Sequence, residues 1–308
     1  MTIEVNMSKK LGSQFNYHSG CAGVNGNCAG ILTDRDLSKR RIDHSLIAVW
    51  EEGSWLPEIR VPWAAVGICR VKKPKACWVA VGSNGAALVI DEMGARPERI
   101  DTEDEPIRKI GLLRSARTID GKAFAAGMIR QLYRRDGENA WTRVDSGCRR
   151  PAGETAIVGF EAVDGFTHND LYGVGWKGEI WHSSGDRWTQ IDSPTGRILS
   201  NVCCAPNGIV YACGRQGILV SGRGDKWETV ENVLTTDDLW GIAWYGGKLY
   251  LATLYSLIMY DGDRLSWVNC GEVTPDSCYH LSASDTHLWS FGAFEVVVYD
   301  GQKWKRFD

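Results

Sequence analysis

A short motif built on tryptophan returns along the chain at a spacing of about 40 residues, and this period constrains the fold more than any other feature. In the motif, a tryptophan stands three residues before an apolar residue, and Asp or Glu usually follows. Motifs begin at Trp141, Trp188, Trp227, Trp267 and Trp304. Towards the N-terminus, Trp55 and Pro97 occupy the same position in their repeats, although proline replaces the tryptophan at residue 97. The chain therefore has seven repeat positions.

Each repeat also carries two short apolar runs separated by a tight turn, in phase with the tryptophans. Clear examples span 78–90, 171–181 and 209–220. Short apolar runs bounded by Gly and Asp predict β-strands joined by hairpins, and the 35 glycines supply the turns. No sustained 3.6-residue period is present, which predicts little helix. Four short strands in about 40 residues are typical of a β-propeller blade.

The sequence thus predicts an all-β chain that forms a single β-propeller domain over 1–308, with seven four-stranded blades. The alternative is six blades preceded by an N-terminal strand, because the glycine-rich start of the first repeat does not match the others. How the ring closes stays open. The expected blades span 12–62, 63–104, 105–150, 151–195, 196–236, 237–277 and 278–308. In this fold the repeat tryptophans fill the widening wedge between neighbouring blades.

Composition narrows the class of protein. Hydrophobic residues make up 44% and charged residues 24% of the chain, as in ordinary globular proteins. A formal net charge of −3 argues against a nucleic-acid binder held by global charge. There is no apolar run of membrane-spanning length and no signal-peptide core, so we expect a cytoplasmic location. The ten cysteines are then expected to be reduced and mostly buried.

No residue pattern predicts catalysis, a metal or a cofactor. Cys203 and Cys204 are adjacent and lack the spacing of a zinc site, and the histidines do not cluster. No nucleophile elbow or phosphate-binding loop precedes a helix. The acidic runs in the loops between blades, such as Asp237 and Asp238, are interpreted as solvated. We therefore expect a protein that is not an enzyme.

The turns between the second and third strands of the blades point to a binding surface. In a propeller these turns and the loops between blades emerge on one face. Tight turns normally hold Asn, Asp, Gly or Ser, whereas several turns here carry aromatic or arginine side chains, which are typical of protein-binding hot spots. The alternative is that the rings fold over the central channel and plug it. The candidate partner-binding residues are Arg40, Arg41, Arg130, Trp176, Lys177, Arg215, Gln216, Tyr255 and Phe294.

Acidic residues of the loops between blades should share this face. They are Glu103, Asp104, Glu105, Asp237, Asp238 and Asp276. The mixture of signs suits a protein partner better than a phosphate backbone, although a basic and aromatic ring can also stack on nucleic acid.

The turns SSGDRW, YDGDRLSW and YDGQKW resemble the loosely conserved bacterial propeller repeats of the WD40, YVTN and BNR type. The resemblance covers nearly the whole chain, and its strength lies in the period rather than in any single motif. The Asp box of sialidases is not matched, because Gly and Asp stand in the opposite order between Ser183 and Trp188. The Trp-Asp dipeptide with an upstream Gly-His, which marks eukaryotic WD40 repeats, is also absent.

Compact propellers of this kind resemble the immunity proteins encoded beside secreted bacterial toxins, including those of type VI secretion. The resemblance implies a monomer that inhibits a cognate toxin by forming a heterodimer with it. The toxin could be a nuclease, since nucleic acid lies in the cytoplasm, but no residue specifies this. The resemblance requires no catalytic residue, membrane or direct contact with nucleic acid. Two alternatives remain, a general protein-interaction or assembly scaffold and a propeller enzyme that acts on carbohydrate at the central mouth.

Overall fold

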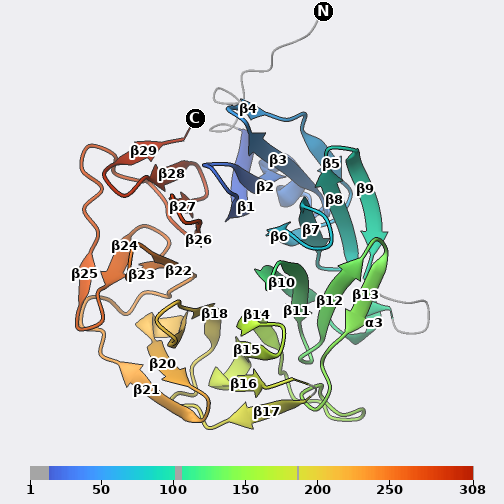
Figure 1. Cartoon of the computed structure of the whole chain (residues 1–308), viewed down its shortest axis with the longest axis vertical. Helices are drawn as coiled ribbons and strands as arrows, with labels where there is room; N and C mark the ends of the chain where they lie inside the picture. The colour runs from blue at the N-terminus through green and yellow to red at the C-terminus, as the bar shows by residue number, and fades with distance from the viewer. Residues whose placement is uncertain (1–13, 101–105, 186, 308) are drawn as a thin grey trace, which may run out of the picture.

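The computed structural model of the chain describes residues 14–100, 106–185 and 187–307. The acidic run Glu103, Asp104 and Glu105 and the predicted blade ends at 12–13, 104–105 and 308 lie outside these residues. Seven antiparallel sheets are arranged as a ring around a central opening (Figure 1). In the described part of the chain, α-helix is confined to α2 (Arg35–Lys39) and α3 (Ile107–Ile110). The prediction of an all-β propeller with seven blades is confirmed.

Six of the blades contain four strands that follow one another from the centre of the ring to its rim. Blade 2 holds β6 (Ala65–Val71), β7 (Cys77–Gly82), β8 (Ala86–Asp91) and β9 (Gly94–Arg99). Blade 3 holds β10 (Leu113–Ile119), β11 (Lys122–Gly127), β12 (Leu132–Gly137) and β13 (Ala140–Arg143). Blade 4 holds β14 (Phe160–Thr167), β15 (Asp170–Gly175), β16 (Ile180–Ser183) and β17 (Trp188–Ile191).

The remaining four-stranded blades follow the same plan. Blade 5 holds β18 (Leu199–Cys204), β19 (Val210–Gly214), β20 (Leu219–Arg223) and β21 (Lys226–Val230). Blade 6 holds β22 (Gly241–Tyr245), β23 (Lys248–Ala252), β24 (Leu257–Tyr260) and β25 (Leu265–Trp267). Blade 7 holds β26 (His280–Ala283), β27 (Leu288–Phe291), β28 (Val296–Tyr299) and β29 (Trp304–Arg306).

Blade 1, whose sequence departs from the repeat, has a divided outer strand. It contains β1 (Phe15–Ala22), β2 (Cys28–Asp34) and β3 (Ser45–Glu51), followed by β4 (Ser54–Trp55) and β5 (Ile59–Val61). Both β4 and β5 pair with β3, so together they take the place of one outer strand. This arrangement makes the first repeat a full blade rather than a single strand added to a ring of six.

The hydrophobic core lies between the blades. The second strands of the blades are almost entirely buried, because a neighbouring blade covers each of their faces; β7 and β19 have no exposed residue. The repeat tryptophans lie in the outermost strands, where a large ring can fill the wedge between neighbouring blades. Trp188 is 2% exposed and stands 5.5 Å from the ring of Phe160, whereas Trp267 on β25 is 49% exposed. All ten cysteines are free thiols, and seven of them are buried.

Within the described residues, blades 7 and 1 share no strand, so the ring closes by packing of side chains and by hydrogen bonds such as that from the Tyr17 N–H to the Ala293 carbonyl at 3.0 Å. Phe15 and Tyr17 on β1 pack with Trp289 and Phe291 on β27. A Cβ atom at Gly20 would lie 2.3 Å from the Phe291 ring, so only glycine allows this close approach. The two ends of the described chain therefore meet within one apolar cluster.

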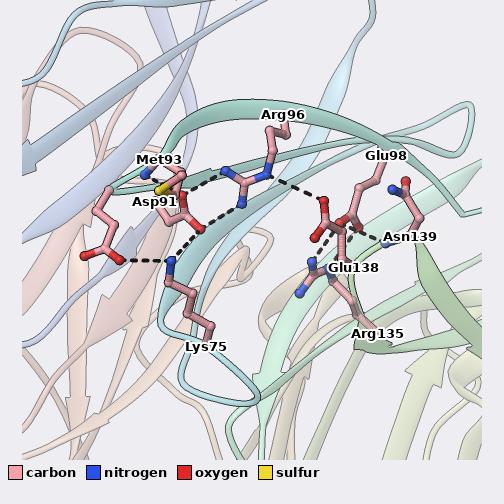
Figure 2. A network of polar contacts seen from close by, with 9 residues as sticks. Lys75, Asp91, Met93, Arg96, Glu98, Arg135, Glu138 and Asn139 are labelled. Carbon is pink, nitrogen blue, oxygen red and sulfur yellow. Dashed lines mark hydrogen bonds and ion pairs between the residues drawn. The ribbon is translucent and has the colours of Figure 1, made fainter.

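An ionic network with a buried pair at its inner end joins blades 2 and 3 (Figure 2). The carboxylate of Glu98 on β9 accepts two hydrogen bonds from the Arg135 guanidinium on β12, at 2.9 and 2.7 Å. The side chains are only 2% and 6% exposed. Glu98 also accepts hydrogen bonds from the Trp141 indole and from the backbone N–H of Asn139. Further out on blade 2, Arg96 forms a bidentate pair with Asp91, and Arg96 links this pair to Glu138 of blade 3 at 3.9 Å.

Candidate binding face

Strand direction places the turns between second and third strands, together with the loops between blades, on one face of the ring. We call it the tip face. Each strand reverses the direction of the one before it, so every second turn along the chain emerges on the same side. The seven tip turns are 35–44, 83–85, 128–131, 176–179, 215–218, 253–256 and 292–295. This face gathers segments from every blade.

Exposed apolar side chains concentrate on the tip face. Eleven large hydrophobic residues are exposed in the described part of the chain. Three of them, Val24, Met93 and Ile209, lie on the opposite face, and Trp267 lies on an outer strand. The other seven lie on tip turns or inter-blade loops and are Ile42, Leu112, Ile157, Val233, Leu254, Tyr255 and Phe294. Exposed apolar residues grouped on one face are typical of protein-binding surfaces.

Six of the nine residues predicted to bind a partner present exposed side chains on this face. Tyr255 is 70% and Phe294 50% exposed, although Arg35 stands 5.2 Å from the Phe294 ring. Arg40 and Arg41 follow α2, whose first turn is capped by Asp34. Lys177 and Gln216 occupy the left-handed second positions of their turns, which direct them away from the blade. The exposed set is Arg40, Arg41, Lys177, Gln216, Tyr255 and Phe294.

The other three residues bind within the protein. The guanidinium of Arg130, only 13% exposed, donates to Glu179 at 2.7 Å and lies over the Trp181 ring. Arg215 pairs with Asp238 and lies 4.3 Å from the Trp240 ring. Burial alone would raise the pKa of Asp238, but hydrogen bonds from the Gln216 backbone N–H and from Arg215 lower it.

Trp176 is held by a residue of the central channel. Its indole N–H donates to Glu161 at 2.6 Å, and Glu161 lines the channel and pairs with Arg114 at 3.1 Å. Trp176 is therefore held within the protein, whereas the rings of Tyr255 and Phe294 remain accessible to solvent.

The central channel is a cavity of about 690 Å³ lined by the innermost strands. Its side chains tie neighbouring blades together. Asp164 on β14 pairs with Arg117 on β10 at 3.1 Å and accepts the backbone N–H of Cys204 on β18 at 2.9 Å. This carboxylate therefore bridges three consecutive blades. It also raises the pKa of the Arg117 guanidinium, which keeps this partly exposed arginine charged.

Two other titratable groups of the channel, His280 and Cys203, are held neutral. Burial, assisted by Arg117 and His18, lowers the pKa of His280 to about 4. Burial raises the pKa of the Cys203 thiol to about 12. A neutral buried thiol is a poor nucleophile and a poor metal ligand. Among the described residues, no three His, Cys, Asp or Glu side chains converge as a metal site would require.

Sequence reasoning missed two groups of residues. Ile42, Leu112, Ile157 and Val233 are apolar residues exposed in polar loops, and such misplaced side chains are the signal that could have identified them. The rings of Trp240 and Tyr279 lie 5.4 Å apart at the channel, tilted by 41°. Both directly precede an innermost strand, and no local pattern distinguishes them from core aromatics.

The fold places the chain among seven-bladed propellers of WD40-like architecture. It resembles the WD40 propeller domain of Doa1 with a TM-score of 0.66 and 10% identity, covering 96% of this chain and 92% of that one. It also resembles YCF48 bound to D1 peptide, with a TM-score of 0.57 and 16% identity over 79% of this chain and 81% of that one. These structural similarities show the fold alone.

The sequence shows the family. The chain is 37% identical over 306 residues to the immune protein Tsi7 of Pseudomonas aeruginosa, and the match covers 98% of this chain and 100% of the relative. The chain therefore belongs to the family of that immune protein. No family model matches it. None of the helices in the described part of the chain has the length and apolar character needed to cross a membrane.

Proposed function

We propose that this chain is an immunity protein that binds a cognate secreted toxin and inhibits it. The observation that carries the proposal is its identity to an immune protein along essentially the full length of both chains. Because the two chains align end to end, the propeller and its tip face fall within the shared region. The mechanism is steric, in that the bound propeller blocks the active site of the toxin or the approach of its substrate.

The tip face is the surface proposed to contact the toxin. It carries most of the exposed apolar side chains, and it also presents Arg40, Arg41, Lys177 and Gln216. The complex is proposed to be a heterodimer in the cytoplasm, formed without a cofactor and without direct contact with nucleic acid. A nuclease is the toxin activity to test first, because its substrate lies in that compartment.

The alternative of a carbohydrate-active enzyme has less support. Such an enzyme needs two carboxylates free to act on the glycosidic bond. In the channel, Glu161 and Asp164 each form an ion pair with an arginine. A general scaffold differs from an immunity protein in its partner rather than in its chemistry, so the experiment has to identify the partner.

The test is co-expression of the chain with the product of the adjacent open reading frame. The immunity proposal expects the neighbouring product to arrest growth when expressed alone. It also expects the propeller to restore growth and to co-elute with that product in size-exclusion chromatography. A neighbour that is harmless and does not co-elute would contradict the proposal.

Two single variants then locate the interface on the molecule. Replacement of an exposed aromatic anchor, Tyr255→Ala, should weaken the complex by about 2 kcal/mol, whereas Met93→Ala on the opposite face should not. Met93 is 76% exposed, so neither variant disturbs the core. Equal affinities for the two variants would place the interface away from the tip face.

A further inference from the structure

The tips of blades 6 and 7 form one continuous surface that is apolar at its centre. Leu254 and Tyr255 come from the blade 6 tip, and Phe294 from the blade 7 tip. We call these three residues the aromatic patch. The loop 268–279 connects the two tips, since the Cys278 N–H donates to the Leu254 carbonyl at 2.7 Å and the Ser277 hydroxyl accepts the Phe294 N–H at 3.3 Å. The patch therefore has a fixed shape.

The loops that carry the aromatic patch and its neighbours contribute only carboxylates, and the cations that reach them come from other segments, since Arg35 lies over the Phe294 ring and Arg306 pairs with Glu295. The segments 231–240, 253–256, 268–279 and 292–295 contain no lysine or arginine. Their carboxylates are Glu231, Asp237, Asp238, Glu272, Asp276 and Glu295. Asp238 and Glu295 pair with Arg215 and Arg306. Glu231, Asp237 and Glu272 are exposed and form no ion pair within the described part of the chain. Asp276 is 79% exposed and reaches Arg306 only at 4.0 Å.

We infer that the aromatic patch and its unpaired carboxylates receive a cationic segment of the toxin, an inference that rests on the proposed function. Burying unpaired carboxylates against a neutral surface is costly, whereas lysine or arginine opposite them restores their pairing. Exposed aromatic rings also attract guanidinium groups. The protein already uses this contact on the tip face, where Arg35 lies over Phe294 and Arg215 over Trp240.

Other occupants fit this surface less well. A second copy of the chain in a two-fold dimer would bring the same carboxylates face to face, because a two-fold contact uses the same patch on both copies. Nucleic acid would bring phosphates against them. By contrast, blade 1 presents Arg40 and Arg41 on the same face.

The experiment measures association rates with the toxin domain that co-elutes with the wild-type chain. The charge-reversal variant is D237K/E272K. The control is Asp263→Lys, an exposed carboxylate in the hairpin at the opposite end of blade 6. At about 20 mM salt, the double variant should associate about 10-fold more slowly than the wild type. At about 0.5 M salt, where screening is strong, the difference should fall below about 3-fold.

The outcomes separate this inference from the proposed function. If no toxin co-elutes with the wild type, the proposed function fails first. If the wild type binds but D237K/E272K associates as fast as the Asp263→Lys control, or faster than the wild type, the cationic segment does not dock here. A neutral variant, D237N/E272Q, covers the case in which the reversal variant does not fold, and it should show a slowing of about 3-fold. Self-association of the wild type that the double variant abolishes would assign the patch to a homodimer and overturn the inference.

Discussion

Removing one partner of the buried Glu98–Arg135 pair should destabilise the propeller strongly, whereas removing both should be far milder. The substitution Glu98→Leu leaves the Arg135 guanidinium, only 6% exposed, without its two hydrogen bonds at 2.9 and 2.7 Å. An unpaired buried charge of this kind costs about 3–5 kcal/mol. Arg135→Met leaves the Glu98 carboxylate unpaired and should cost a similar amount.

The double variant E98L/R135M removes both charges from the junction between blades 2 and 3. The Trp141 indole, which donates to Glu98 at 3.1 Å, then loses its acceptor, and this loss costs about 1 kcal/mol. The backbone N–H of Asn139 can turn to water, because that residue is exposed. The double variant should therefore lose about 1–2 kcal/mol, and the coupling energy between the two positions should exceed about 3 kcal/mol.

Equilibrium unfolding in urea, followed by circular dichroism, measures these differences. Lys39→Ala serves as the control, because Lys39 and Asp36 form a pair that is 77% and 82% exposed. Such surface pairs contribute less than about 1 kcal/mol. A coupling energy below about 1 kcal/mol, or a double variant as unstable as the worse single variant, would refute the reasoning.

Three further predictions concern the tip face and the channel. Gly178→Ala should cost about 2 kcal/mol or more in thermal unfolding, because φ is +71° and the new Cβ would lie 2.1 Å from the Thr195 carbonyl; an unchanged melting curve would contradict this. Arg130→Ala should lower the free energy of unfolding by about 3 kcal/mol, since it leaves Glu179 buried and unpaired, yet the folded fraction should still bind the toxin. Binding lost without destabilisation would instead make Arg130 a contact residue. The pKa of His280 is near its ordinary value in the unfolded chain but about 4 in the folded chain. The unfolded chain therefore binds the proton more tightly, and acid favours unfolding. Stability should fall by up to about 3 kcal/mol between pH 6.5 and 4, and His280→Asn should flatten this part of the profile.

Much of the architecture could be predicted because its determinants are local. The spacing of the tryptophans counts the blades, and the apolar runs with their glycine turns locate the strands, since backbone pairing within a hairpin joins residues close in sequence. The same logic identified the tip turns. It gave less guidance at blade 1, where the outer strand is divided between β4 and β5 and the tryptophan motif is reduced to Trp55.

Whether each tip side chain is buried or exposed depends on residues that are distant in the sequence. Arg130 meets Glu179 from the next blade, and Trp176 meets Glu161 across its own blade. Tyr255 finds no such partner and stays in solvent. All three looked alike in the sequence, because each is a large side chain in a short turn. The difference arises from a contacting residue that is distant in the sequence, and the repeat does not determine which distant residues meet.

The sequence by itself predicted a propeller, with seven blades favoured over six, and the face on which its turns gather. The tertiary structure decided which of those turns remain available to a partner and which carboxylates remain unpaired around Tyr255 and Phe294. The physical reason is one of range. Strand pairing and turn geometry act over a few residues, whereas burial and ion pairing are set by whichever side chains the closed ring brings together.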